Sequence, residues 1–65
     1  MTLIEAVQAE MTRCRELLKQ YQEIGRVGAF GTRVIQDSLA AAHAALKSGH
    51  VVALEHALHD LKARK

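Results

Sequence analysis

The chain has 65 residues, a formal net charge of +2, no proline and a single cysteine. A chain of this length forms one domain at most, here residues 1–65, and its core is marginal without a disulfide, a metal or a partner subunit. One cysteine excludes an internal disulfide. The acidic and basic residues are interleaved, which is typical of a solvated surface and not of a polyanion-binding one. Composition therefore favours association as the means of stabilising the core.

The chain carries no pattern of export or membrane insertion. Its N-terminus lacks a basic segment followed by an apolar run, so no signal peptide is expected. No stretch approaches the roughly 18 consecutive apolar residues of a membrane span. A lone cysteine fits a reducing compartment. We therefore expect a cytoplasmic protein with no membrane segment.

The first segment carries a narrow apolar stripe at alternating spacings of three and four. This is the a/d pattern of a helix that buries one stripe against another helix. Thr2 and Glu5 have the spacing of a capping box, and Gly25 suits the left-handed residue that ends a helix. The pattern predicts a helix over about 3–24. The residues of the stripe are Ile4, Val7, Met11, Cys14, Leu18 and Tyr21.

Three glycines at a spacing of three, Gly25, Gly28 and Gly31, predict a tight turn after this helix. In this interpretation Gly28 and Gly31 let the next helix approach the first closely, and Phe30 covers the end of the bundle. The second helix is expected over about 30–47. Its apolar face consists of Ile35, Leu39, Ala42 and Leu46.

A break at Ser48-Gly49-His50 predicts a third, short helix over about 51–62, with Leu54, Leu58 and Leu61 on its apolar face. This helix can fold back over the first two or reach across to a second subunit. The expected fold is all-α: an antiparallel helical hairpin with a short third helix. Two copies are expected to form a dimeric helical bundle through the stripe of the first helix and the alanine-rich face of the second.

Four histidines raise the question of a metal site: His43, His50, His56 and His59. A zinc site needs three or four ligands that converge tetrahedrally. A helical wheel places His56 and His59 opposite the leucine face, where they and Glu55 are exposed. We therefore expect surface histidines, no metal and no cofactor.

Other candidate chemistry is weaker. Cys14 occupies a core position, where a cysteine acts as a small hydrophobe, and its neighbours Arg13 and Arg15 are expected to point to other faces. The glycine turn could present backbone N–H groups to an anion near Arg26 and Arg33, but it lacks the strand and the Gly-Lys-Ser/Thr run of a phosphate loop. No grouping of nucleophile and base is present. The chain is not expected to be an enzyme.

Nucleic-acid binding is the alternative function. The second helix, the break and the third helix superficially resemble a helix-turn-helix, whose second helix reads the major groove. Such a helix should expose basic or amide side chains. The exposed face of the third helix instead carries Val52, Glu55, His56, His59 and Asp60. The charges thus argue against nucleic acid as the partner.

Several short runs between Arg13 and Lys62 form a further pattern: Arg15-Glu16-Leu17-Leu18, Tyr21, Ile24-Gly25, Gly28-Ala29-Phe30-Gly31, Ala44-Ala45-Leu46 and Ser48-Gly49. With these runs, this part of the chain resembles a group of short bacterial and prophage-encoded helical-hairpin proteins. The group has an acidic residue where His50 stands here, and His50 is a poorer N-cap. The resemblance implies a common hairpin fold and a phage or mobile-element setting, and it transfers no catalytic residue.

The expected function is that of a small non-enzymatic protein-interaction module, an adaptor or inhibitor that displays a helical surface to a host protein. The residues expected to carry the structure and the interface are Ile4, Val7, Met11, Cys14, Leu18, Tyr21, Gly25, Gly28, Phe30, Gly31, Ile35, Leu39, Leu46, Leu54, Leu58 and Leu61.

Overall fold

The computed structural model describes residues 1–65 and contains only helices. The elements, in chain order, are α1 (Leu3–Ile24), the 3₁₀ helix η1 (Gly25–Gly28), α2 (Ala29–Ser48) and α3 (Val51–Lys62). The all-α class is confirmed. The second helix extends one residue further at each end than the expected 30–47. It starts at Ala29 because η1 runs into α2 without a break, and it ends at Ser48, just before Gly49.

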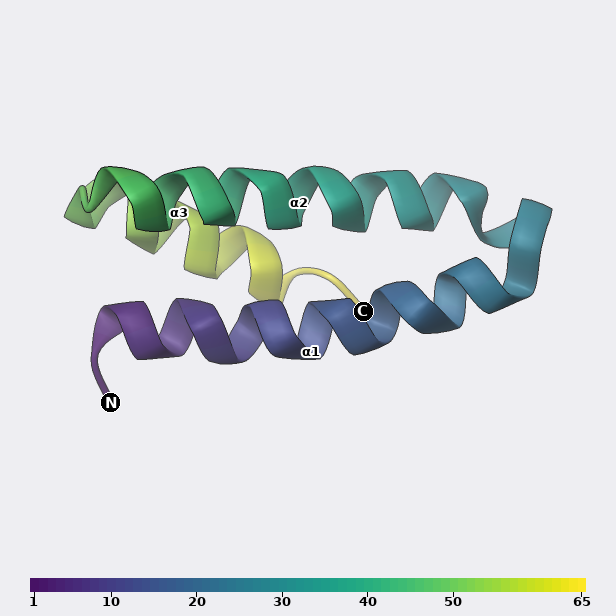
Figure 1. The fold of residues 1–65 in the computed structure, drawn as a ribbon, viewed down its shortest axis with the longest axis horizontal. Coiled ribbons are helices and arrows are strands. Elements are labelled where there is room, and N and C mark those ends of the chain that lie inside the picture. The colour runs from purple at the N-terminus through teal and green to yellow at the C-terminus, as the bar shows by residue number, and fades with distance from the viewer.

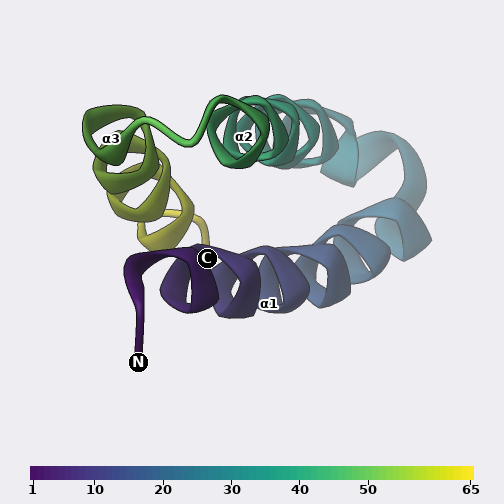
Figure 2. The same ribbon diagram turned by 60° about the vertical axis from the view of Figure 1, so that its left-hand side comes forward.

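The three helices form a short rod of 36 × 18 × 17 Å. Helices α1 and α2 run in opposite directions along its long axis, joined by η1 at one end (Figure 1). Helix α3 starts beside the end of α2 and crosses toward α1 (Figure 2). It packs against both α1 and α2. The third helix thus folds back onto its own chain.

Local sequence signals set the helix ends. The Glu5 N–H donates to Thr2 Oγ1 at 3.1 Å and the Thr2 N–H donates to Glu5 Oε1 at 3.0 Å, which completes the capping box. The bond from the Thr2 backbone lowers the pKa of Glu5. Gly25 and Gly49 have φ of 74° and 71°, a region that favours glycine. His50 is the N-cap residue before α3, and its side chain makes no capping hydrogen bond.

The core is aliphatic and receives residues from all three helices. Its members are Val7, Met11, Cys14, Ile35, Ala42, Ala45, Leu54, Ala57 and Leu61. Leu18, Tyr21, Leu39, Leu46 and Leu58 are partly buried against it. Because α3 packs against both α1 and α2, these nine residues are buried within a single chain.

The first-helix stripe is only partly as expected. Val7, Met11 and Cys14 are buried, but Ile4 is 48% exposed, and Leu3 packs against the core in its place. A strict a/d pattern drifts by about 20° per heptad around a straight helix, so it cannot stay on one face for its full length. The buried centre of this stripe already faces α2 and α3, so it is not available for pairing with a second copy.

Long side chains of α1 hold the carboxyl end of α3, a role that sequence reasoning missed. The Arg13 guanidinium donates to the Leu61 carbonyl at 2.7 Å and to the Arg64 carbonyl at 2.9 Å. The Tyr21 hydroxyl donates to the Lys65 carbonyl at 2.8 Å. Leu61 lies in the last turn of α3, whose carbonyls have no partner within the helix, while Arg64 and Lys65 lie beyond its end, so these bonds hold both the last turn and the residues that follow it. The expectation for Arg13 was wrong, because its side chain reaches around the helix to within 3.8 Å of Cys14 Sγ.

Candidate interaction surface

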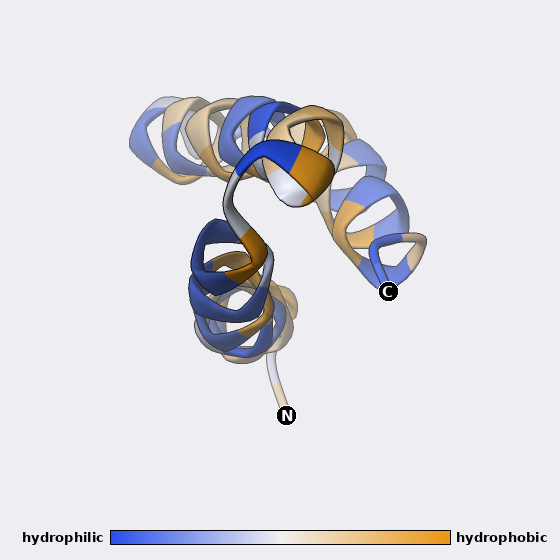
Figure 3. Cartoon of the chain, turned by 90° about the vertical axis from the view of Figure 1, so that its right-hand side faces the viewer, coloured by the Kyte–Doolittle hydropathy of each residue, from blue (hydrophilic) through white to orange (hydrophobic).

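Three large apolar side chains are exposed where α1 turns into α2. Ile24 is 55% exposed, Val27 88% and Phe30 82%. We call these three residues the turn-end patch. Figure 3 looks onto this end of the rod, where hydrophobic and hydrophilic segments alternate across the turn. A patch of exposed apolar side chains marks a candidate interaction site.

The exposure of Phe30 corrects the expectation that this ring covers the end of the bundle. Gly28, Gly31 and Ile35 share one face of the η1–α2 segment, because residues three or four apart lie on the same side of a helix. That face points inward: Gly28 and Ile35 are buried, and Gly31 is partly buried. Phe30 lies about 100° from Gly31 around the helix and therefore points outward.

The two glycines permit the close approach of α2 to α1. A Cβ on Gly28 would collide with the backbone carbonyl of Tyr21, and one on Gly31 would lie 2.5 Å from two ring carbons of Tyr21. Both positions therefore need glycine. Neither Gly25 nor Gly49 has a neighbour within 4 Å of such a Cβ, so their requirement is for positive φ alone.

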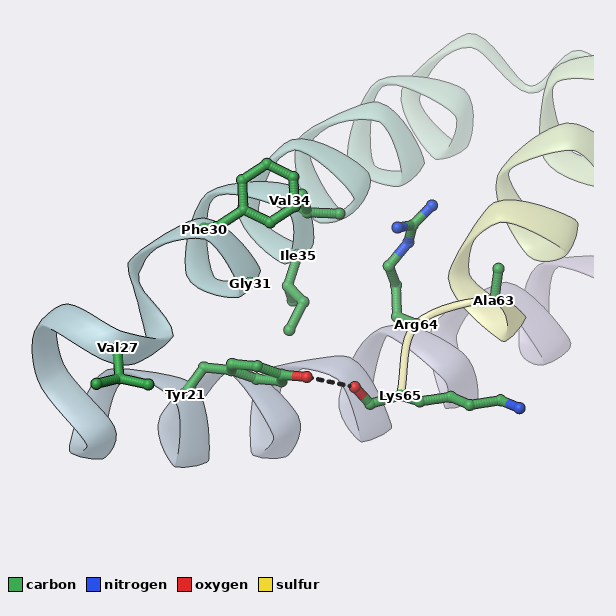
Figure 4. Close-up of a pocket in the computed structure, with 9 residues that line it drawn as sticks. All are labelled: Tyr21, Val27, Phe30, Gly31, Val34, Ile35, Ala63, Arg64 and Lys65. Carbon is green, nitrogen blue, oxygen red and sulfur yellow. Dashed lines mark hydrogen bonds between the residues drawn. The ribbon is translucent and has the colours of Figure 1, made fainter.

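An open hollow of about 460 Å³ lies beside the patch. In Figure 4, the Ile35 side chain extends from α2 toward the Tyr21 ring, whose hydroxyl points to Lys65, while Phe30 and Val34 both lie on α2. The volume falls in the range of about 300–1,000 Å³ typical of ligand pockets. Its lining consists of Tyr21, Val27, Phe30, Gly31, Val34, Ile35, Ala63, Arg64 and Lys65.

The charges at the hollow come from the end of the chain. The Arg64 Nη2 lies 2.8 Å from Asp60 Oδ1, so that guanidinium is paired. The Arg64 Nε is buried without a hydrogen-bond partner. No acidic side chain lines the hollow. The surface is therefore mainly apolar, with cationic groups on one side.

Asp60 is the one carboxylate of this region with a perturbed pKa. Hydrogen bonding from the buried Ser38 hydroxyl of α2 lowers the pKa of Asp60 most, and Arg64 lowers it further, while partial burial acts in the opposite direction. A carboxylate whose pKa is lower in the folded state adds stability above its unfolded pKa, near pH 4, and loses it as the pH falls.

We therefore expect Asp60→Asn to lower the free energy of unfolding by about 0.5–1 kcal/mol at pH 6, since the carboxylate is partly exposed. The difference between the two proteins should shrink as the pH falls from about 5 to about 2.5. Urea unfolding at a series of pH values measures this difference. A gap that stays constant over that range would exclude the assigned role of the carboxylate.

Cys14 is fully buried, and burial raises the pKa of its thiol, although the Arg13 guanidinium acts in the opposite direction. A raised thiol pKa disfavours the nucleophilic thiolate. The Cys14 thiol donates to the Leu61 carbonyl at 3.6 Å. Its contacts are those of a core side chain.

The four histidines are all exposed, and no group of three or more His, Cys, Asp or Glu side chains could hold a metal ion. On the outer face of α3, Val52 is 64% exposed, and Glu55, His56 and His59 are exposed beside it. This face presents one carboxylate and no arginine or lysine before Lys62. It lacks the groups that read base edges.

At the glycine turn, the two arginines differ. Arg33 pairs with Asp37 at 3.4 Å, whereas Arg26 is exposed and has no ion pair. The Ala29 N–H, at the start of α2, donates to the Arg26 carbonyl. The turn thus offers one cation without an ion pair, and the Ala29 N–H is already bonded within the turn.

A second hollow, of about 560 Å³, lies between α2 and α3. Five alanines form most of its lining: Ala41, Ala44, Ala45, Ala53 and Ala57. No large exposed apolar side chain borders it. We therefore place the candidate site at the turn end.

Sequence reasoning placed Phe30 and the glycines in this region but missed Val27, Val34 and the 63–65 segment. Val27 carried one signal: it is a large apolar residue inside a glycine-rich turn, outside every helical stripe. The 63–65 segment carried none, because only the path of α3 brings it beside Tyr21 (Figure 4).

Comparison with protein families, curated proteins and solved structures finds no match to this chain. The structure holds no helix with both the length and the apolar character needed to cross a bilayer.

Proposed function

We propose that this chain is a small non-enzymatic protein-interaction module that acts through the turn-end patch and the adjoining hollow. The observation that carries the proposal is the exposure of Phe30, the one phenylalanine of the chain, at 82% beside an apolar hollow. Aromatic residues are enriched among the side chains that dominate binding energy at protein interfaces. A ring left in water at the tip of a rigid helix pair is suited to docking.

The proposed setting is the cytoplasm of a host cell in which a phage or mobile element supplies the chain as an adaptor or inhibitor. The resemblance to short prophage-encoded proteins supports this setting. The mechanism is display: η1 and the two helices hold the patch in place, so that little conformational entropy is lost on binding. No grouping of side chains in the structure suggests bond-making chemistry.

The test is site-specific photo-crosslinking in the source cell, with the photoreactive residue at position 27 and, as the matched control, at position 52. Val27 and Val52 are both exposed valines, but Val52 lies on the outer face of α3. We expect protein crosslinks from position 27 that disappear when Phe30→Ser is added. Equal crosslinking from both positions would contradict the proposal.

Salt-dependent retention of the purified protein on DNA, lost on mutation of α3, would favour a nucleic-acid-binding regulator instead.

A further inference from the structure

We infer that the partner of the turn-end patch is a second copy of this chain, bound across a two-fold axis. The inference rests on the proposed function, since it names the occupant of the same surface. In the contact, Phe30 of each copy enters the hollow of the other. The result is a dimer joined at the turn ends and not along the first-helix stripe.

Shape supports this assignment first. A two-fold interface uses the same patch on both subunits, so the patch must be complementary to itself. The turn end meets this condition because a projecting ring and an apolar hollow lie side by side on it: Phe30 itself borders the hollow lined by Tyr21, Val34 and Ile35 (Figure 4). In the proposed dimer, each ring lies against the hollow of the other copy.

Charge supports it independently. Glu23 and Arg26 are exposed on either side of Ile24 and Gly25, and neither takes part in any of the four ion pairs of the chain. A two-fold contact brings residue i to residue j and residue j to residue i. Glu23 of each copy can then pair with Arg26 of the other. A different partner that presented only one sign of charge to this surface would place a like charge opposite either Glu23 or Arg26.

The size of the contact surface sets the expected strength. The turn-end patch and the residues that line the hollow number ten in all, well below the roughly 20–30 residues that each partner contributes to an interface of standard size. A dimer joined only at the turn ends is therefore weak, and it should be sought at protein concentrations from about 10 µM to 1 mM.

The experiment is sedimentation equilibrium of the purified full chain over this concentration range. We expect a reversible monomer–dimer equilibrium. Phe30→Ser should raise the dimer Kd at least about thirty-fold, the size expected on removing a central aromatic contact. Val52→Ser should leave the Kd within about twofold. Circular dichroism checks that each variant remains helical, as expected for changes at exposed positions.

A charge-reversal cycle makes the test specific for the two-fold contact. Glu23→Arg and Arg26→Glu should each weaken the dimer, since each places like charges opposite one another. The double variant restores both pairs with their signs exchanged, so its Kd should return toward that of the wild type. A double variant weaker than either single change would overturn the two-fold geometry.

Failure of this inference can be told apart from failure of the proposed function. A wild-type chain that stays monomeric to about 1 mM would overturn the dimer. If position 27 then still crosslinks to a protein of a different mass in the cell, the interaction module stands with another occupant. An equal effect of Phe30→Ser and Val52→Ser on the Kd would also overturn the dimer, because it would place the contact elsewhere.

Discussion

Replacing Gly28 with alanine is expected to lower the free energy of unfolding by about 3 kcal/mol or more, one of the two largest effects of any single change in the chain. The new Cβ would collide with the carbonyl group of Tyr21, which is backbone and cannot rotate away. Overpacking typically costs about 1–3 kcal/mol where side chains can adjust. Here α1 and α2 must separate or the turn must rebuild.

Thermal unfolding followed by circular dichroism measures this loss. In a domain of this size, about 1 kcal/mol shifts Tm by roughly 4–8 °C, so a fall of about 12 °C or more is expected.

Gly31→Ala should cost less, because its Cβ meets the Tyr21 ring, a side chain that can shift. Val27→Ala in the same turn should change stability by less than about 0.5 kcal/mol, since Val27 is exposed. An unchanged Tm for Gly28→Ala would show that the observed approach of the helices is not required.

Replacing Leu61 with alanine is the second large expected effect, with a loss of about 3–4 kcal/mol. Leu61 is fully buried and lies on the last turn of α3. Removing a buried leucine costs the transfer free energy of the lost atoms and leaves a cavity, together about 2–5 kcal/mol. The same turn carries the Leu61 carbonyl that accepts from Arg13, so loosening it also weakens the attachment of α3 to α1.

Urea unfolding and hydrogen exchange together separate this effect from a general loss of helix. The matched control is Val52→Ala on the same helix, where the side chain is exposed and the expected change is below about 0.5 kcal/mol. In Leu61→Ala, amides of α3 should exchange faster than those of α1. A variant with the stability of the control would mean that α3 does not stabilise the core.

Several local features followed from the sequence because the interactions that cause them are local. The capping box of Thr2 and Glu5 needs only residues three apart, and positive φ at Gly25 and Gly49 needs only the absence of a Cβ. The buried positions Val7, Met11 and Cys14 follow from the spacing of the stripe. Such signals depend on a few consecutive residues and are readable before the fold is known.

The candidate site was less accessible to this reasoning. Phe30 was expected to be covered because it is aromatic and follows a turn, yet Gly28 and Gly31 take the inner face and turn the ring outward. Ile4 was expected to be buried because it continues the spacing of the stripe, yet Leu3 replaces it. In both cases the decision depended on which face of a helix meets another helix, and this is a property of the packed chain.

By itself, the sequence determined that the chain is helical and, to within a residue, where its helices begin and end. It also determined which glycines a bend or a close approach requires. These features depend on helix propensity, capping and steric contacts over a few residues. The tertiary structure alone decided that α3 packs against both α1 and α2, that Arg13 and Tyr21 of α1 bind the carbonyls of residues 61–65, and that the apolar residues of the turn remain in contact with water. The bonds of Arg13 and Tyr21 join residues more than forty positions apart. The path of α3 and the exposed side of the turn likewise depend on which helix faces meet, and no local pattern specifies that.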